Sequence, residues 1–146
     1  MADALLEVNG LRKQFGGVVA LSNGRFVLQP GSVHALCGGN GAGKSTFCKA
    51  IAENFTEQGL KVGILTLEES VSSYATSMIG MRLRRNLNLE EGDPTKDPAY
   101  WETFDEMESN LTFYSDDGDR SEEAVSNHIR FMRIACECDI IVLDHI

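Results

Sequence analysis

The sequence has little positive charge: Lys and Arg together number 13, against 22 Asp and Glu, so the net charge of the 146-residue chain is −9. Contacts to nucleic-acid phosphates need Lys and Arg, so an acidic chain is a poor non-specific binder of DNA or RNA. The sequence also lacks a run of 18 apolar residues, so we expect no membrane span. Its first ten residues lack a basic start followed by an apolar stretch, so we expect no signal peptide and a cytoplasmic protein.

Cysteine is also scarce, and no C-x-x-C pair occurs. The chain has Cys37, Cys48, Cys136 and Cys138. Without a secretion signal, reduced thiols are expected rather than disulfides. The C-x-C at 136–138 has no second cysteine pair to complete a zinc site, so we expect helix or core cysteines. A chain of this length forms about one domain and buries roughly 68–70% of its unfolded surface, enough for a core.

The order of expected elements indicates an α/β fold. Residues 4–37 are punctuated by NG, GG, SNG and a Pro30-Gly31 turn, which predicts short strands and turns, with a strand over 32–37. Beyond it, helical and strand-like patterns alternate. The expected elements are helices over 46–57, within 68–87 with Ser70 as a possible N-cap, over 99–110 and over 121–136, strands over 61–67, 111–114 and 139–146, and a loop over 90–98. This alternation predicts βαβ units with a parallel sheet flanked by helices.

The segment GGNGAGKST at 38–46 fits G-x-x-x-x-G-K-[ST], the loop that wraps nucleotide phosphates. Its glycines allow the backbone N–H groups to approach the phosphates at a helix N-terminus. Lys44 would reach the β- and γ-phosphates, as part of the catalytic apparatus, and the Ser45 hydroxyl would bind Mg²⁺. The expected ATP-binding residues are Gly38, Gly39, Asn40, Gly41, Ala42, Gly43, Lys44, Ser45 and Thr46.

Two carboxylates complete the expected site. Asp144 ends the apolar run IIVLD, the form of a Walker B segment, whose aspartate holds Mg²⁺. The position after it is His145, where a carboxylate would have served as base. Glu68 follows the strand expected over 61–67, and ligands bind at the carboxyl ends of parallel strands. We therefore predict that Glu68 orients the attacking water, with Glu69 as the alternative; an acidic helix N-terminus in solvent is the other interpretation of this segment.

Residues 5–50 resemble the start of ABC-type ATPases, particularly those of sugar importers. The shared features are FGGVVAL, the Pro-Gly turn, VHAL and NGAGKST, in that order. The resemblance implies that Phe15 stacks on adenine and that the partners are membrane subunits of a transporter. Gly39 departs from the pattern, which usually has Glu or Pro there. We find no LSGGQ-like signature, no glutamine loop of the expected type and no Glu after Asp144, so we expect this resemblance to end after the loop.

Residues 44–146 resemble the RecA-like core of hexameric replicative helicases of the DnaB-like group, especially the phage helicase-primase and Twinkle type. The segments GKSTF, KVGILTLEESV, MIGMRLR, TFY and CDIIVLDHI follow in the matching order. By this resemblance Lys44 and Ser45 form the Walker A pair, Glu68 is the catalytic glutamate and Asp144 the Walker B aspartate. It also implies single-stranded DNA and a homo-hexamer as partners, in DNA replication. Such a core continues beyond Ile146, so we expect a C-terminally incomplete core that hydrolyses ATP weakly or not at all alone.

Because both resemblances meet at the phosphate loop, we interpret the chain as a junction between two phosphate-loop proteins. Residues 1–37 would be a β-rich ABC-like segment, and residues 38–146 a partial NTPase core. The favoured function is Mg-ATP binding, with helicase-type hydrolysis once the core is completed. An ABC transporter ATP-binding subunit and a non-catalytic nucleotide-binding fragment are the alternatives. Whether a recombined gene or an artificial join produced the chain stays open.

An arginine cluster and a tryptophan are candidates for contact with nucleic acid. Arg82, Arg84 and Arg85 cluster at the end of an expected helix, where they could meet nucleic acid or a neighbouring subunit. Clustered charges at a helix end are usually solvated, and we favour that interpretation. Trp101 could stack on a base, but its helical spacing with Phe104 favours core packing.

Overall fold

The computed structural model describes residues 4–15, 18–37, 43–115 and 118–144. The chain divides into two compact units, Met1–Cys37 and Gly38–Ile146. Among the described residues, no helix combines the length and the apolar character needed to cross a bilayer.

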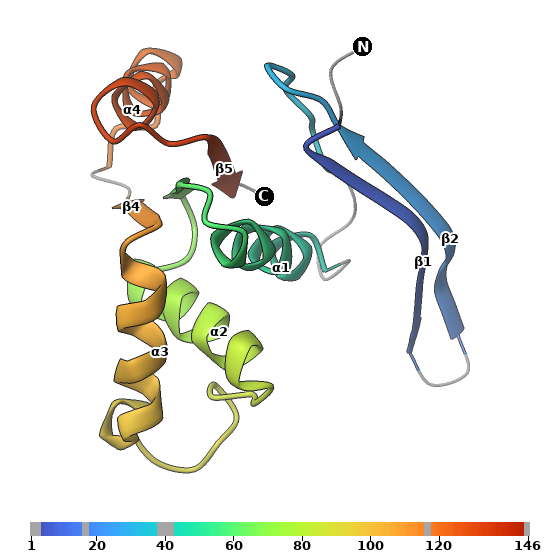
Figure 1. Cartoon of the computed structure of the whole chain (residues 1–146), viewed down its shortest axis with the longest axis vertical. Coiled ribbons are helices and arrows are strands. Elements are labelled where there is room, and N and C mark those ends of the chain that lie inside the picture. The colour runs from blue at the N-terminus through green and yellow to red at the C-terminus, as the bar shows by residue number, and fades with distance from the viewer. Residues whose placement is uncertain (1–3, 16–17, 38–42, 116–117, 145–146) are drawn as a thin grey trace. The chain divides into compact units, whose positions relative to one another are not determined.

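The first unit is an antiparallel hairpin of β1 (Leu6–Phe15) and β2 (Val18–Leu28) (Figure 1). Its strands are longer than expected, and the turns predicted at Asn9-Gly10 and at 22–24 are wrong, because both segments lie inside strands. The pairing register shifts between Val8 and Leu11, and Gly10 has φ +69°. Gly10 therefore lies at an irregularity of the strand pairing, although the sequence pattern predicts a turn there.

The segment after the hairpin differs from expectation in one respect. The Pro30-Gly31 turn is confirmed: Gly31 has φ +69°, and the Ser32 N–H donates to the Gln29 carbonyl over 3.3 Å. The strand predicted over 32–37 is wrong, because these residues form neither helix nor strand and are exposed. Val33 is 99% exposed, so the apolar side chains of this segment are not buried as a core strand would require.

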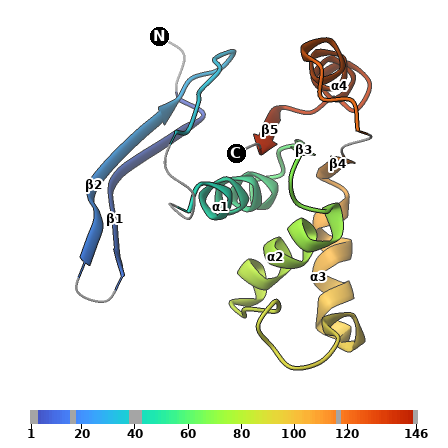
Figure 2. The ribbon, with the colours of Figure 1, turned by 180° about the vertical axis from the view of Figure 1, so that it is seen from behind.

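The second unit is a three-stranded parallel sheet with helices. Its strand order is β4-β3-β5, so β3 lies in the centre. The elements are α1 (Lys44–Glu57), β3 (Val62–Thr66), α2 (Val71–Leu83), η1 (Pro94–Lys96), α3 (Pro98–Glu108), β4 (Leu111–Ser115), α4 (Glu122–Ile134) and β5 (Ile140–Asp144). Helix α4 lies across the sheet from α1 and α2 (Figures 1 and 2). The predicted α/β class with a parallel sheet and flanking helices is confirmed; the short helix η1 lies in what was expected to be a loop.

The helix boundaries follow local signals. Ser70 caps α2, because its side chain accepts a hydrogen bond from the Ser73 N–H over 3.2 Å, as predicted. Ser121 caps α4 in the same way, accepting from the Ala124 N–H over 3.2 Å. Gly59 follows the end of α1 with φ +78°, the left-handed conformation that glycine adopts at low cost.

The core is built around β3, whose five residues are all buried. Successive side chains of a strand point to opposite faces, so β3 serves both layers of helices. On one face, Leu65 and Leu67 cluster with Met132 of α4 and with Cys138. At Gly63 a Cβ would lie 2.9 Å from the Met132 sulfur, so this strand position admits no side chain without movement. The close fit holds α4 against the sheet and leaves the opposite face to α1 and α2.

The strand β5 is less buried than its apolar run predicts. Its residues are half-buried except Leu143, which is 43% exposed. Within the described part of the chain β5 forms an edge of the sheet, with β3 as its partner. An edge strand has one flank uncovered, which explains the exposure of residues suited to a central position.

The arginine cluster is not uniformly solvated: Arg82 donates to Glu53 over 2.6 Å with its side chain 17% exposed, while Arg85 pairs with Glu90 and Asp97. Arg84 is exposed, as predicted. The Arg82 pair joins α2 to α1, and the Arg85 pairs hold the segment that follows α2.

Trp101 is not a core residue. It is 49% exposed and donates from Nε1 to the Thr95 carbonyl over 2.8 Å, while its ring contacts Tyr100 and Phe104 edge-on. The helical spacing with Phe104 therefore predicts the contact between the rings but not the burial.

Candidate functional site

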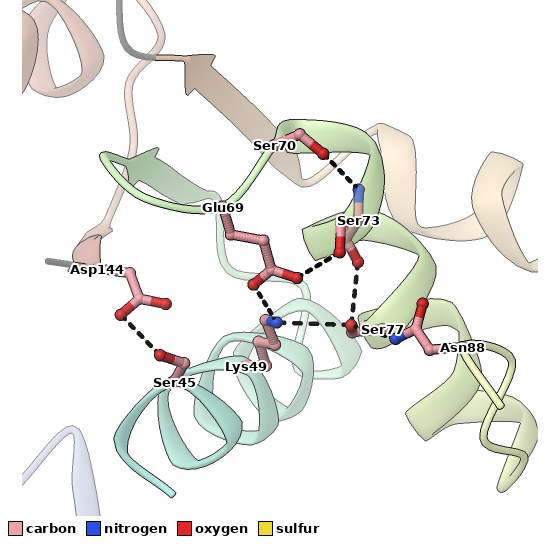
Figure 3. Close-up of polar contacts among 8 residues, drawn as sticks. All are labelled: Ser45, Lys49, Glu69, Ser70, Ser73, Ser77, Asn88 and Asp144. Carbon is pink, nitrogen blue, oxygen red and sulfur yellow. Dashed lines mark hydrogen bonds and ion pairs between the residues drawn. The ribbon is translucent and has the colours of Figure 1, made fainter. Parts of the chain in front are cut away.

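The candidate site lies at the carboxyl edge of the sheet in the second unit. Parallel pairing places Thr66, at the end of β3, opposite Asp144, at the end of β5. The two ends are also joined by a hydrogen bond of 3.2 Å from the Leu67 N–H to the Asp144 carbonyl. Helix α1 begins at the same place, because the Ser45 hydroxyl donates to Asp144 Oδ1 over 3.1 Å (Figure 3). Two residues separated by 99 positions in the chain thus meet at one point.

The N-terminus of α1 favours negatively charged ligands. Its first turn contains no acidic residue, so no side chain of that turn offsets the positive end of the helix dipole. Gly43 stands at the N-cap with φ +85° and ψ +19°, and it makes no side-chain cap. This left-handed conformation needs a glycine, as predicted for the loop, and it turns the chain into Lys44 and Ser45 at the start of the helix.

Two neighbouring glutamates complete the edge, and they have different surroundings. Ser45, Glu68, Glu69 and Asp144 line one cavity of about 260 Å³. Glu68 is exposed, whereas Glu69 is half-buried. The Glu69 carboxylate accepts hydrogen bonds from Lys49 Nζ over 2.5 Å and from the Ser73 hydroxyl over 2.6 Å (Figure 3). The structure therefore brings both candidate glutamates beside Ser45 and Asp144 and engages Glu69 with a buried cation.

Lys49 is the residue that sequence reasoning missed. It stands one helical turn after Ser45, so both side chains lie on the same face of α1. Its side chain is only 9% exposed, its Nζ lies 3.5 Å from the Ser77 hydroxyl, and the same atom lies 4.5 Å from the centre of the Tyr74 ring. The i, i+4 spacing from Ser45 was the only sequence signal for it.

The electrostatics of the site follow from these contacts. Burial acts to raise the pKa of Glu69, but hydrogen bonds from Lys49 and Ser73 and the Lys49 charge outweigh it, so this pKa lies below its usual value. Burial raises the pKa of Cys48, and the nearby Asp144 carboxylate raises it further. Glu69 therefore stays ionised in its ion pair, and Asp144 places a negative charge beside Ser45 and Cys48 in the first turns of α1.

The charges of this site also act on Tyr74. Its side chain is fully buried, and within the described ranges its hydroxyl has no hydrogen-bond partner. Burial raises the pKa of Tyr74 strongly, and the charges of Asp144, Cys48 and Glu69 add to the shift. Tyr74 therefore stays neutral and packs as a ring, against Lys49 and edge-on to Phe113.

The residues present fit a magnesium ion held together with a nucleotide. Mg²⁺ takes oxygen ligands, and it is usually bound through one or two carboxylates with substrate phosphates supplying others. Ser45 and Asp144 place a hydroxyl and a carboxylate in contact, 3.1 Å apart. No group of three or more His, Cys, Asp or Glu side chains suited to a metal occurs in the part of the chain that the structure describes. A site made only of protein ligands is therefore not found there.

Several expected site residues lie outside the described residues. These are Gly38, Gly39, Asn40, Gly41 and Ala42 of the phosphate loop, and His145. The backbone of Phe15 belongs to β1, but its side chain is likewise outside the description. Of the expected residues, the structure describes Gly43, Lys44, Ser45, Thr46, Glu68 and Asp144.

Comparison with known proteins shows the family to which this chain belongs. A family model described as ABC transporter matches residues 21–131, more than half of the chain. The match extends well past the phosphate loop, so the expectation that the ABC resemblance ends there is wrong. These comparisons give no support to the helicase resemblance.

Curated relatives are ATP-binding proteins of sugar import. One from Burkholderia cenocepacia, provisionally named for ribose, galactose and methyl galactoside import, is 57% identical over 60 residues, 40% of this chain and 12% of its own length. The L-arabinose transport ATP-binding protein AraG of Geobacillus stearothermophilus is 52% identical over 52 residues, 36% of this chain and 10% of its own. Ribose import ATP-binding protein RbsA 2 of Rhizobium etli is 54% identical over 52 residues, also 36% and 10%. The matched part of this chain thus spans about a tenth of each relative.

Proposed function

The chain belongs to the ABC transporter family, and from this premise we propose that its second unit binds ATP with Mg²⁺ at the N-terminus of α1. The observation that carries the proposal is the contact between the Ser45 hydroxyl and the Asp144 carboxylate, 3.1 Å apart. It joins the serine of the G-x-x-x-x-G-K-[ST] pattern to the aspartate of the predicted Walker B strand. Nucleotide-binding proteins of the phosphate-loop class hold Mg²⁺ with this pair of groups.

The proposed roles follow the chemistry of each group. Backbone N–H groups of residues 38–46 surround the phosphates, favoured by the positive end of α1. Lys44 binds the β- and γ-phosphates, and Ser45 and Asp144 hold Mg²⁺, which neutralises charge on the phosphate oxygens. Glu68, exposed in the same cavity, orients the water that attacks the γ-phosphate.

The setting of this activity is also part of the proposal. Relatives named for ribose and arabinose import suggest that this chain serves sugar uptake together with membrane subunits. Because the matched part of this chain spans about a tenth of those proteins, we propose that the chain binds nucleotide but turns it over weakly alone.

Titration with a fluorescent ATP analogue tests the binding proposal. Wild type should bind in a Mg²⁺-dependent manner, and Lys44→Ala should weaken binding at least about tenfold, the loss expected when a charged phosphate contact of about 1.5–3 kcal/mol is removed. Lys96→Ala is the matched control, because Lys96 is exposed in η1 and should leave the affinity unchanged. Equal affinities for wild type and Lys44→Ala would contradict the proposal.

Hydrolysis of the helicase type is a second candidate, supported by one observation. Glu68 follows the central strand β3 and lines a cavity with Ser45 and with Asp144 of the adjacent strand β5. This arrangement suits a water-orienting carboxylate carried by the strand after the phosphate-loop helix. If this candidate is right, single-stranded DNA should stimulate ATP turnover and Glu68→Gln should abolish it while binding persists. Without DNA stimulation, the candidate is rejected.

A further inference from the structure

The hydroxyl of Thr66, at the end of the central strand β3, is buried and has no hydrogen-bond partner among the described residues. The residue is only 2% exposed. Burying a hydroxyl without a partner is costly, because the hydrogen bonds that it makes to water in the unfolded chain are lost. Nearly all buried polar groups in folded proteins bond to the protein itself, to ordered water or to a ligand. The Thr66 hydroxyl therefore indicates a bound polar group beside the candidate phosphate site.

The side chain of Thr66 points to the face of the sheet that α1 and α2 cover. Successive side chains of a strand alternate between the two faces. Leu65 and Leu67, the neighbours of Thr66 in the chain, both pack with Met132 of α4 on the other face. The Thr66 hydroxyl is therefore buried between the sheet and the layer of helices that contains the N-terminus of α1.

On this face Thr66 lies beside Asp144. The two residues are register partners in the parallel strands β3 and β5. Neighbouring strands lie about 4.7–4.9 Å apart, and residues paired in register point to the same side of a sheet. Asp144 reaches α1 on this side, where its Oδ1 accepts the hydrogen bond from Ser45 (Figure 3). The Thr66 hydroxyl is thus adjacent to the carboxylate of the proposed metal site and does not bond to it.

A second unpartnered hydroxyl belongs to the same layer. The hydroxyl of Tyr74, in α2, is also buried without a partner in the part of the chain that the structure describes. Burial raises the pKa of Tyr74, and the Asp144 charge raises it further, so the two groups lie within electrostatic reach of each other. Buried water is typically held where two to four polar groups can bond to it. Two hydroxyls and a carboxylate in one layer are therefore suited to binding water.

We propose that Thr66 is a positioning residue of the metal site, whose hydroxyl hydrogen-bonds a water molecule bound to Mg²⁺ beside Asp144. The inference rests on the proposed function, because it concerns the ion that Ser45 and Asp144 would hold. Mg²⁺ loses its water reluctantly and usually keeps several water ligands in proteins. Side chains that bond to the ligands of a metal orient those ligands, and their loss typically lowers metal affinity by roughly 10–100-fold.

Titration of the full chain with Mn²⁺ tests the inference. The protein is kept in excess over a non-hydrolysable ATP analogue, and free Mn²⁺ is measured by electron paramagnetic resonance, which gives the affinity of the protein–nucleotide complex for the ion. Thr66→Val keeps the shape of the side chain without its hydroxyl and should weaken Mn²⁺ binding about tenfold. Thr66→Ser keeps the hydroxyl and should retain wild-type affinity. Binding of the analogue in EDTA, without metal, should be the same in all three proteins.

Thr76→Val is the matched control. Thr76 is also buried, but its hydroxyl bonds to Tyr100 over 3.0 Å and the residue does not line the cavity of the site. This variant loses a buried hydrogen bond and should still bind Mn²⁺ with wild-type affinity.

The outcomes separate this inference from the proposed function. Wild type that binds neither the analogue nor Mn²⁺ overturns the proposed function and the inference with it. Wild type that binds both, with unchanged Mn²⁺ affinity in Thr66→Val, overturns the inference alone. The inference is also overturned if Thr66→Ser binds Mn²⁺ as weakly as Thr66→Val, or if Thr66→Val loses affinity for the analogue in EDTA as well, since a merely structural role has these effects. If Thr66→Val fails to fold by circular dichroism, Thr66→Ala, which also lacks the hydroxyl, is measured against the same outcomes.

Discussion

Removing one partner of the Lys49–Glu69 pair should destabilise the protein unequally, depending on which partner is lost. Glu69→Gln leaves a lysine whose side chain is 9% exposed without its charge partner. Breaking a fully buried pair from one side costs about 3–5 kcal/mol, because a charge stays buried without compensation. Here the Ser77 hydroxyl at 3.5 Å and the Tyr74 ring at 4.5 Å still stabilise the cation. We therefore expect a smaller loss for Glu69→Gln, about 2–3 kcal/mol.

Lys49→Met should cost less than Glu69→Gln. The remaining Glu69 side chain is 30% exposed and keeps its hydrogen bond from Ser73, so its charge can be solvated. Methionine also fills much of the volume of the lysine stem beside Tyr74. We expect a loss of about 1–2 kcal/mol, and a double variant less destabilised than the sum of the two single variants, because buried pairs couple.

Urea denaturation at neutral pH measures these differences as shifts of the midpoint at constant slope. The reasoning is refuted if Lys49→Met loses as much stability as Glu69→Gln or more. It is also refuted if the losses of the two single variants add in the double variant, since additivity would mean that the two side chains do not interact.

Two further outcomes are expected. Lowering the pH from the usual glutamate pKa of 4.5 through the lower pKa of folded Glu69 should destabilise wild type, because the unfolded chain then binds more protons than the folded one. The urea midpoint, measured as a function of pH in the acid range, should fall less steeply in Glu69→Gln than in wild type. Gly80→Ala should destabilise by about 1–2 kcal/mol in thermal or urea unfolding: a Cβ would lie 2.7 Å from the Arg85 carbonyl oxygen, and this overpacking exceeds the gain of about 1 kcal/mol from helix propensity. Stabilisation by Gly80→Ala would contradict that contact.

Local patterns were enough to predict most elements of the second unit. The apolar run over 61–67 predicted a buried strand, and Ser70 was identified as a possible helix cap; both are confirmed, with β3 over Val62–Thr66 and Ser70 at the start of α2. These predictions succeeded because strand alternation, helical spacing and caps depend on neighbours within a few residues. Where pairing partners decided the outcome, local patterns failed: Asn9-Gly10 lies inside a strand, and residues 32–37 form none.

The candidate site, too, was predicted from the sequence only in part. The residue pattern alone was sufficient to nominate Ser45, Glu68 and Asp144, because each follows or precedes an element recognisable from its own spacing. It left Glu69 as the alternative to Glu68, because the two residues are adjacent in the chain and identical in chemistry. Only packing distinguishes them, since Lys49 and Ser73 come from two different helices and converge on Glu69. Which carboxylate pairs with Lys49 depends on how α1 and α2 meet, and that contact between distant segments leaves no periodic signal in the sequence.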